Sequence, residues 1–174
     1  MEVSVITLVK DRKDRLKNLI KGLNRNTVLP NELIVIHMNE APFDYGETKF
    51  DVVQKAIESD CELPLSRARN LGAYSASCPL LIFLDVDCIP SSTLISAYIE
   101  SFNEVNGQLT MGNVRYLKSN FVYGVDEQLH SQSIFHPQRP HGSSENLSKS
   151  LDYGLFWSLN FCISHSIFTQ IGGF

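Results

Sequence analysis

Two aspartates one residue apart end a strongly apolar run at residues 80–90, LLIFLDVDCIP. In an extended segment residues i and i+2 point to the same side, so the carboxylates of Asp85 and Asp87 can face one ligand while Val86 faces the core. Mg²⁺ and Mn²⁺ favour carboxylate oxygens and commonly bridge one or two carboxylates to the phosphates of a nucleotide. The pattern therefore predicts a metal and diphosphate site. The alternative is that the two acids solvate a turn and cap the helix expected near Ser91, because short D-x-D patterns also occur by chance.

The N-terminal segments predict a strand, a helix and a second strand. Residues 3–9, VSVITLV, form a β-branched apolar run, and apolar residues recur at helical spacing over residues 11–26. A short apolar run at residues 33–37 then predicts a buried strand reached through a helical crossover, which makes the two strands parallel. Residues 38–62 are polar and poorly patterned, and no element is predicted there.

A helix and a further strand lead to the two aspartates. Small residues occur every four positions at Ala68, Gly72 and Ala76, which predicts a closely packed helix. The continuous apolar strand at residues 80–84 is typical of parallel sheets covered on both faces. A helix with an apolar stripe within residues 94–102 follows it. The alternation of strands and helices predicts an α/β layered fold, in which ligands bind at the carboxyl ends of the strands.

The last third of the chain has a different character. Residues 109–117 predict another strand, residues 153–165 a further apolar strand, and residues 166–174 a short helix ending at glycines. Residues 118–150 form a long loop of a kind that is more often functional than part of a core. Its irregularly spaced histidines are predicted to be solvated loop residues and not metal ligands: His130, His136 and His141.

Length, composition and charge limit the classes of function. A chain of 174 residues with 43% hydrophobic and 20% charged residues is predicted to form one soluble globular domain. The net charge of −4, without a basic block, argues against a nucleic-acid partner. No apolar run reaches the roughly 20 residues of a membrane span, and the N-terminus lacks a signal-peptide pattern, so a cytoplasmic location is expected. The cysteines form no C-x-x-C pair and are predicted to be reduced, structural residues: Cys61, Cys78, Cys88 and Cys162.

Three segments, in order and spacing, resemble the family-2-type glycosyltransferases of the GT-A fold. VSVITLVKDRKDRLKNLIKGLNRNTVLPNELIVIHMNE is similar to their opening strand, helix and strand, and LPLSRARNLGAYSASCPLLIFLDVDCIPS to their A-R-N-x-G helix and D-x-D strand. LNFCISHSIFTQIGGF is similar to their N-F-x-x-x-R-x-x-F-x-x-x-G-G-F segment. The resemblance covers most of the chain and implies a three-layer α/β/α, Rossmann-like nucleotide-diphospho-sugar transferase domain with a mainly parallel central sheet. It also implies a nucleotide-sugar-binding half at residues 1–106 and a partial acceptor half at residues 107–174.

The resemblance implies an inverting, metal-dependent glycosyltransferase that moves a sugar from a nucleoside diphosphate donor to a hydroxyl group of a glycan, a lipid-linked sugar or a small molecule. It assigns Asp87 to the divalent cation, Mn²⁺ or Mg²⁺, and Asp85 to the ribose or the cation. Arg69 is expected to contact base or phosphate, with a surface salt bridge as the alternative. Aromatic faces suit sugar rings, so Trp157 is an acceptor-site candidate together with Asn160, although a core position also fits Trp157. The remaining nucleotide-binding candidates lie at the ends of the first two strands: Thr7, Leu8, Val9, Asp11, Asn39 and Glu40.

Two features depart from the family pattern. Residues 8–11, LVKD, replace the frequent P-x-Y-N, and residues 37–40, HMNE, replace D-D-G-S, so the donor nucleotide cannot be carried over and a UDP-sugar is the default. Family members also continue after Gly-Gly-Phe to an acidic segment whose carboxylate acts as the general base that inverting transfer requires. The sequence stops at Phe174, so the chain is expected to be truncated, with its general base beyond this residue.

Two other functions remain open. A chain with this fold and without the base would be a non-catalytic sugar-nucleotide-binding fragment, since fold does not imply function. Phosphatases of the haloacid dehalogenase type also place D-x-D after an apolar strand, but normally after the first strand of the domain, whereas two predicted strands precede it here.

Overall fold

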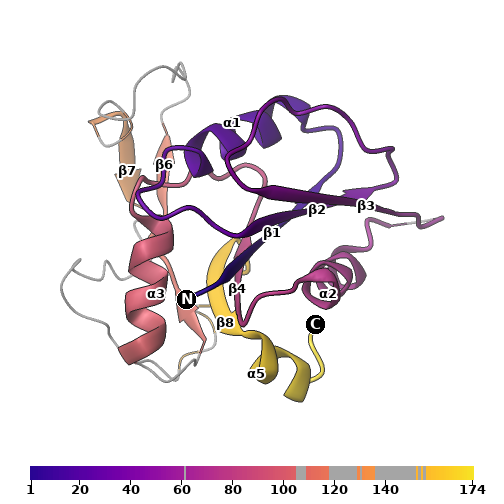
Figure 1. The fold of residues 1–174 in the computed structure, drawn as a ribbon. Helices are drawn as coiled ribbons and strands as arrows, with labels where there is room; N and C mark the ends of the chain where they lie inside the picture. Colours follow the sequence, from indigo (N-terminus) through magenta and orange to yellow (C-terminus); the bar gives the residue numbers. More distant parts are fainter. Residues whose placement is uncertain are drawn as a thin grey trace.

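The structure, a computed structural model, describes residues 1–60, 62–104, 109–117, 129, 131–135, 152, 154 and 156–174. Within these residues the central sheet is built from β1 (Val3–Val9), β2 (Glu32–Met38), β3 (Asp51–Ile57), β4 (Leu80–Leu84), β5 (Thr110–Met111) and β8 (Asn160–Ser164). Their order is β3-β2-β1-β4-β8-β5 (Figure 1). The first four strands are parallel, whereas β8 runs antiparallel to β4 and to β5. The predicted mainly parallel sheet is confirmed.

Helices cover both faces of this sheet. The described helices are α1 (Lys13–Leu23), α2 (Leu65–Ser75), α3 (Leu94–Glu104) and α5 (His165–Gln170). Figure 1 shows α1 and α2 on opposite sides of the strands. One core cluster joins α1 and α3 to the sheet, and a second cluster joins α2 and α5 to its other face. The predicted three-layer α/β/α architecture is therefore confirmed.

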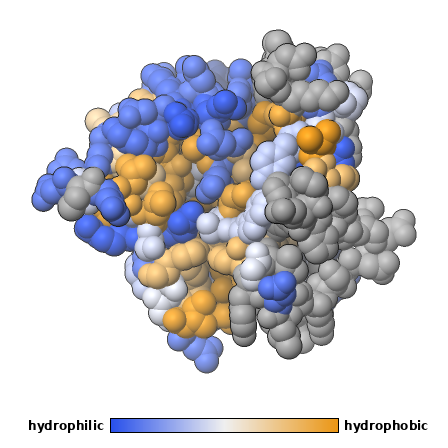
Figure 2. Space-filling model, turned by 180° about the vertical axis from the view of Figure 1, so that it is seen from behind, coloured by the Kyte–Doolittle hydropathy of each residue, from blue (hydrophilic) through white to orange (hydrophobic). Residues whose placement is uncertain are grey.

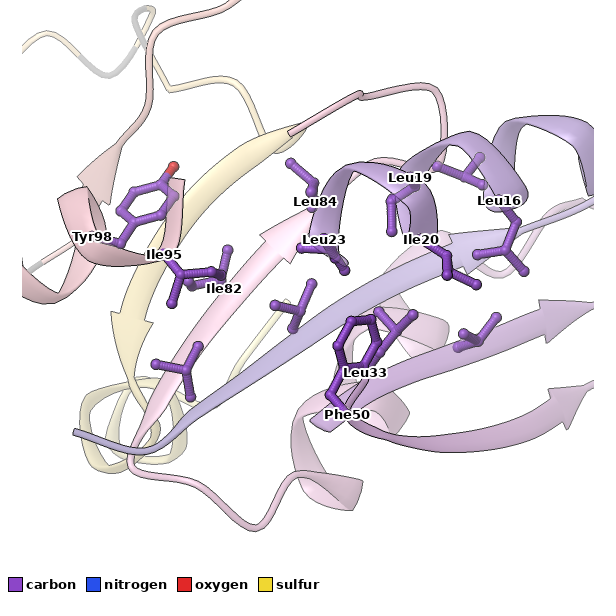
Figure 3. Close-up of a cluster of buried hydrophobic side chains, with 14 of the residues drawn as sticks. Leu16, Leu19, Ile20, Leu23, Leu33, Phe50, Ile82, Leu84, Ile95 and Tyr98 are labelled. Carbon is purple, nitrogen blue, oxygen red and sulfur yellow. The ribbon is translucent and has the colours of Figure 1, made fainter. Parts of the chain in front are cut away.

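The core on the α1 face follows from the sequence pattern of α1. Its apolar residues Leu16, Leu19, Ile20 and Leu23 recur at helical spacing and are all buried. Figure 3 shows them directed at the strands, with Ile95 and Tyr98 of α3 completing the cluster. The strands carry apolar residues on both sides because each face is covered by helices; β4 is a continuous apolar run, whereas β1 and β2 also bury polar side chains such as Ser4 and His37.

The α2 face depends on small residues. A Cβ at Gly72 would lie 2.4 Å from Cγ2 of Ile6 on β1, so only glycine allows the helix to approach the strand this closely. Ala68 and Ala73 on the same helix are fully buried. The predicted close packing is confirmed, and it fixes the position of Arg69, which lies three residues before Gly72.

A buried carboxylate joins strands at the amino-terminal edge of the sheet. Oε1 of Glu32 accepts hydrogen bonds from Ser4 Oγ at 2.6 Å, from the backbone N–H of Ser77 at 2.7 Å and from Ser77 Oγ at 2.8 Å. Burial raises the pKa of Glu32, but the hydrogen bonds from Ser4 and Ser77 outweigh it, so the pKa of this carboxyl is lower than usual. These residues lie at the amino ends of the strands, whereas the two aspartates lie at the carboxyl end of β4.

Several predictions for individual segments were wrong. The strand β3 lies inside the stretch for which no element was predicted. The single strand predicted at residues 109–117 is divided into β5 and β6 (Arg115–Leu117), and β6 pairs with β7 (Ser133–Phe135) in a separate two-stranded sheet. Of the described residues in the strand predicted at residues 153–165, only Asn160–Ser164 form a strand, β8, and His165 begins α5.

Other predictions concern thiols, histidines and membrane spans. Cys78, Cys88 and Cys162 are free, as predicted, while Cys61 lies outside the described residues. The predicted solvated histidines of the long loop also lie outside the described residues: His130, His136 and His141. In the part of the chain that the structure describes, no helix is long and apolar enough to cross a membrane.

Candidate functional site

Hydrogen bonds tie the carboxyl ends of β1 and β2 together. The backbone N–H of Asp11 donates to Glu40 Oε2 at 2.7 Å, and Lys10 Nζ donates to the carbonyl oxygen of Asn39 at 2.9 Å. Asp11 and Asn39 have φ values of 52° and 53°, in the left-handed region that Asp and Asn enter more readily than most residues. Both strands therefore end in a sharp turn, and the nucleotide-binding candidates that follow them meet at one edge of the sheet.

A buried histidine orients Glu40. The ring of His37 is fully buried, with Nδ1 3.3 Å from Glu40 Oε1 and Nε2 2.8 Å from Gln54 Oε1. Phe43 packs edge-on against this ring, with the centroids 4.9 Å apart. Both oxygens of Glu40 already have a partner, but a carboxylate oxygen can accept more than one hydrogen bond, so Glu40 can still accept a hydrogen bond from the edge of a nucleotide base. Sequence reasoning missed Gln54 because it lies on β3, the strand that was not foreseen.

The candidates on β1 have buried side chains. Leu8 and Val9 belong to the cores on opposite faces of the sheet. Thr7 is also buried, and its Oγ1 has no hydrogen-bond partner among the described residues. Any contact from these three residues to a nucleotide would therefore come from the backbone.

Asp85 and Asp87 lie in a turn at the carboxyl end of β4. The backbone N–H of Cys88 donates to the carbonyl oxygen of Asp85 at 2.9 Å, which closes a turn of four residues. The pair therefore lies in this turn and not in an extended segment, and Val86 faces the core as predicted. The backbone N–H of Asp85 donates to the carbonyl oxygen of Leu159 at 2.8 Å, which fastens the turn to the segment before β8. The side chains of Asp85 and Asp87 are 46% and 60% exposed and can meet a ligand.

Arg69 of α2 faces Asp85. Its Nη2 lies 3.7 Å from Asp85 Oδ1 and donates to Ser158 Oγ at 3.2 Å, while its guanidinium carbon lies 5.1 Å from the centre of the Phe174 ring. The Arg69 side chain is only 12% exposed, so on the arginine side this ion pair is largely shielded from solvent. Burial raises the pKa of the Asp85 carboxyl; Arg69 opposes this shift and the neighbouring charge of Asp87 adds to it.

The C-terminal residues hold this arginine in place. The Asn70 side chain donates to the carbonyl oxygen of Phe174 at 3.1 Å and accepts from its backbone N–H at 2.9 Å. A Cβ at Gly173, where φ is 78°, would lie 2.5 Å from Asn70 Oδ1. The two glycines predicted to end the last helix thus allow Phe174 to reach α2, a role that the sequence pattern did not indicate.

Two arginines that sequence reasoning did not select face Asp87. Asp87 Oδ1 lies 3.6 Å from Nε of Arg15 and 4.0 Å from Nε of Arg12, both at the start of α1. The available signal was the run of alternating charges, DRKDR, directly after the first strand. Such a run usually forms a solvated helix start, and of its five residues only Asp11 was selected as a site candidate.

The same arginines line a cleft of about 540 Å³, within the range of roughly 300–1,000 Å³ typical of small-molecule sites. Its lining also includes Lys13, Phe43 and the acidic residues Asp11, Asp14 and Glu40, but not Asp85, Asp87 or Arg69. Arg12 and Arg15 are therefore the connection between this cleft and the aspartate pair. Figure 2, a view from behind, shows hydrophilic residues gathered on its upper left, which corresponds to the right of Figure 1, where β2 and β3 end.

The two aspartates fit a divalent cation whose other ligands are water molecules and substrate phosphates. In the described residues no group of three or more His, Cys, Asp or Glu side chains comes together as a closed metal site. Two exposed carboxylates at a strand end are the donor type that Mg²⁺ and Mn²⁺ prefer, and these ions usually complete their shell with water and substrate phosphates. Asp85 and Asp87 are the residues that would hold such an ion.

The two acceptor candidates differ. Asn160 is 5% exposed; its Oδ1 accepts from the Tyr98 hydroxyl at 2.7 Å, and its Nδ2 lies 3.5 Å from the carbonyl oxygen of Asn113. Contact with an acceptor would require these interactions to break. Trp157 is partly exposed and is not a member of either core cluster that the described residues form.

Comparison with known proteins identifies the fold. No family model matches the chain, and no curated protein matches its sequence. Residues 1–349 of TarS from S. aureus, in complex with UDP-GlcNAc, superpose with a TM-score of 0.66 at 13% identity, over 98% of this chain and 47% of that one. The mannosyltransferase PcManGT from Pyrobaculum calidifontis, in complex with GDP-Man and Mn²⁺, superposes with a TM-score of 0.61 at 13% identity, over 99% of this chain and 47% of that one.

These similarities show that the chain has a GT-A-like glycosyltransferase fold, as the sequence predicted. The chain spans about half the length of the solved structures that it matches.

Proposed function

We propose that this chain is the donor-binding domain of a glycosyltransferase that moves a sugar from a nucleoside diphosphate, by default UDP, to a hydroxyl acceptor with inversion. The observation that carries the proposal is the aspartate pair at the carboxyl end of β4, beside Arg69 and in a sheet of GT-A order. The solved complexes of TarS with UDP-GlcNAc and of PcManGT with GDP-Man support this class of ligand. In this proposal residues 1–106 form the donor half and residues 107–174 part of the acceptor half.

Each site residue has a role in this proposal. Asp85 and Asp87 hold Mn²⁺ or Mg²⁺, which when bound neutralises the charge that develops on the leaving diphosphate. Arg69, fixed by Ser158, offers a guanidinium at the same edge, a group that recognises phosphate oxygens through paired hydrogen bonds.

In this proposal the nucleotide base and the acceptor bind on the two sides of the aspartate pair. Glu40 and Asn39, together with the backbone of Thr7, Leu8, Val9 and Asp11, bind the nucleotide base and ribose. The partly exposed Trp157 offers an aromatic face to the acceptor sugar. We assign no general base among the described residues.

Calorimetric titration of the chain with UDP, with and without Mn²⁺, tests the proposal. Binding should require Mn²⁺, and Asp87→Ala should weaken it by about 10- to 100-fold or more, as expected for loss of a group that holds a metal. Asp51→Ala removes a carboxylate at the amino end of β3, far along the strand from the site, and should leave binding unchanged. If UDP, GDP, thymidine diphosphate and cytidine diphosphate all fail to bind at any Mn²⁺ or Mg²⁺ concentration, the proposal is wrong.

The same sample separates the two other functions. Binding of a nucleotide sugar without transfer or release of the sugar would favour a non-catalytic binding domain. Hydrolysis of a phosphoryl-ester dye would favour the phosphatase, although three strands precede the aspartate pair in the chain and that class normally places the pair after the first.

A further inference from the structure

Two guanidinium groups at the start of α1, from the capping residue Arg12 and from Arg15, converge on one carboxylate of the candidate site. Arg15 and Arg12 both approach Asp87 Oδ1, at 3.6 Å and 4.0 Å, and their side chains are 59% and 57% exposed. Exposed ion pairs of this length contribute little to stability, because water screens them and two long side chains must be ordered. The stability of the fold therefore does not explain why two arginines meet at this acid.

Both members of the aspartate pair have a cationic partner before any metal ion binds. Arg69 faces Asp85, and Arg12 and Arg15 face Asp87, so three guanidinium groups surround two carboxylates. A divalent cation that approaches Asp87 must displace the α1 arginines or bind beside their positive charges. The arrangement disfavours a metal ion on its own.

The same positive charges favour an anion that arrives with the metal. Arg12 and Arg15 line the cleft at the ends of β1 and β2. The rest of its lining is formed by Lys13, by Phe43 and by the acidic residues Asp11, Asp14 and Glu40. A guanidinium released from Asp87 is thus already at the wall of a cleft of ligand size. Diphosphate oxygens accept bidentate hydrogen bonds from arginine, and these are stronger than hydrogen bonds between neutral groups.

We propose that Arg12 and Arg15 exchange partners when the donor binds: they pair with Asp87 in the empty site and with the donor diphosphate once a divalent cation has taken Asp87. This inference rests on the proposed function and names the diphosphate as the group that these two residues recognise. It makes the cation and the nucleoside diphosphate bind weakly alone and strongly together. The cation alone would have to displace the two arginines from Asp87, and the diphosphate alone would have to draw them away from this carboxylate; each ligand removes the obstacle that the other would meet. The coupling is reciprocal, as linkage requires.

The experiment compares Arg12→Gln/Arg15→Gln with a charge-matched control, Lys17→Gln/Lys21→Gln, which removes two cations further along the same helix. Mn²⁺ binding without nucleotide is measured from the electron paramagnetic resonance signal of free Mn²⁺, and UDP binding at saturating Mn²⁺ by calorimetry. In the arginine variant Mn²⁺ alone should bind about three- to tenfold more tightly, since two exposed ion pairs no longer compete. UDP should bind about tenfold more weakly, since charge-assisted hydrogen bonds to the diphosphate are lost. The lysine variant should change neither affinity by as much as twofold.

The opposite signs distinguish the exchange from a structural role. A variant that merely disturbed α1 would weaken both ligands, and that result would overturn the inference, as would an unchanged UDP affinity or equal effects in the lysine control. Thermal unfolding checks that the variant is folded. Asp87→Asn offers a second route: it frees the arginines without moving them, so it should abolish Mn²⁺ binding while strengthening the binding of UDP in the absence of metal.

The inference and the proposed function fail differently. If wild type binds UDP with Mn²⁺ but the arginine variant binds it equally well, only the inference fails. If wild type binds no nucleoside diphosphate, both fail.

Discussion

Replacing Gly72 by alanine tests how the sequence sets the distance between α2 and the sheet. The new Cβ would lie 2.4 Å from Ile6 Cγ2, whereas carbon atoms pack at roughly 3.5–4.0 Å, so the helix must retreat by about 1 Å or Ile6 must leave its rotamer. Overpacking of this kind costs about 1–3 kcal/mol, and the better helix propensity of alanine returns about 1 kcal/mol. We expect Gly72→Ala to lower the free energy of unfolding by up to about 2 kcal/mol.

A double-mutant cycle measured by urea unfolding isolates this contact. Ile6→Ala removes Cγ2, and the next neighbour of the new Cβ, Ile36 Cγ1, lies at an ordinary 3.6 Å. In the Ile6→Ala background Gly72→Ala should therefore stabilise the protein by about 1 kcal/mol, which reverses its sign. Ile6→Val keeps the branching methyl group and serves as the control in which Gly72→Ala remains destabilising. Equal effects of Gly72→Ala in the alanine and valine backgrounds would refute the reasoning.

The same retreat should reach the site. Arg69 lies on the same helix, with Nη2 3.7 Å from Asp85 and 3.2 Å from Ser158 Oγ, so a shift of about 1 Å takes it beyond hydrogen-bond distance. Gly72→Ala should weaken UDP binding although residue 72 itself has no contact with the cleft. Unchanged UDP affinity in a variant with measurably lower stability would show that Arg69 is not needed for the donor.

Three further predictions concern single side chains. Glu32→Gln keeps an acceptor oxygen but removes the charge. Because the pKa of Glu32 is lowered in the folded state, wild type should be more stable than the variant by about 1 kcal/mol above the usual pKa of 4.5. This difference in the free energy of unfolding should vanish as the pH falls through the folded pKa. An equal difference at pH 3 and pH 7, by urea unfolding, would contradict this. Arg69→Lys keeps the charge and loses the planar fork, so UDP affinity should fall about tenfold in calorimetry with little change in melting temperature; full affinity would argue against a phosphate contact. Burial, with the nearby Asp85 adding to it, raises the pKa of Cys88 to about 12, and burial raises the pKa of Cys162 to about 12. Mass spectrometry after alkylation of the native protein at pH 8 should therefore find both thiols intact, and rapid labelling of either would be inconsistent with its raised pKa.

Sequence patterns predicted the elements that are buried on both faces. The runs that became β1, β2 and β4 are mostly apolar because helices cover both sides of the sheet. By contrast, β3 lies at the edge of the sheet, where one side of the strand is unpaired and charged residues such as Asp51 and Lys55 are tolerated. Its sequence therefore carries too weak a pattern to stand out from a loop.

The candidate site could be predicted only in part, because some of its features follow from local sequence patterns and others from long-range contacts. The position of Asp85 and Asp87 follows from the strand that precedes them, and Arg69 follows from the resemblance of its helix to a known motif. The contacts between Arg69, Asn70 and Phe174 join residues more than 100 positions apart, and no local pattern encodes them. The hydrogen bond that fastens the turn at Asp85 to the segment before β8 is likewise long-range, and a local reading of the strand could not include it.

Diffraction from crystals grown with UDP and Mn²⁺, recorded at the manganese absorption edge, tests the donor site most directly. The account predicts one strong anomalous peak between the carboxylates of Asp85 and Asp87, with the diphosphate beside it and the base over the ends of β1 and β2. Arg12 and Arg15 should have left Asp87 for the diphosphate. A manganese peak at another location, or UDP bound away from the carboxyl edge of the sheet, would contradict the assignment of this edge as the donor site.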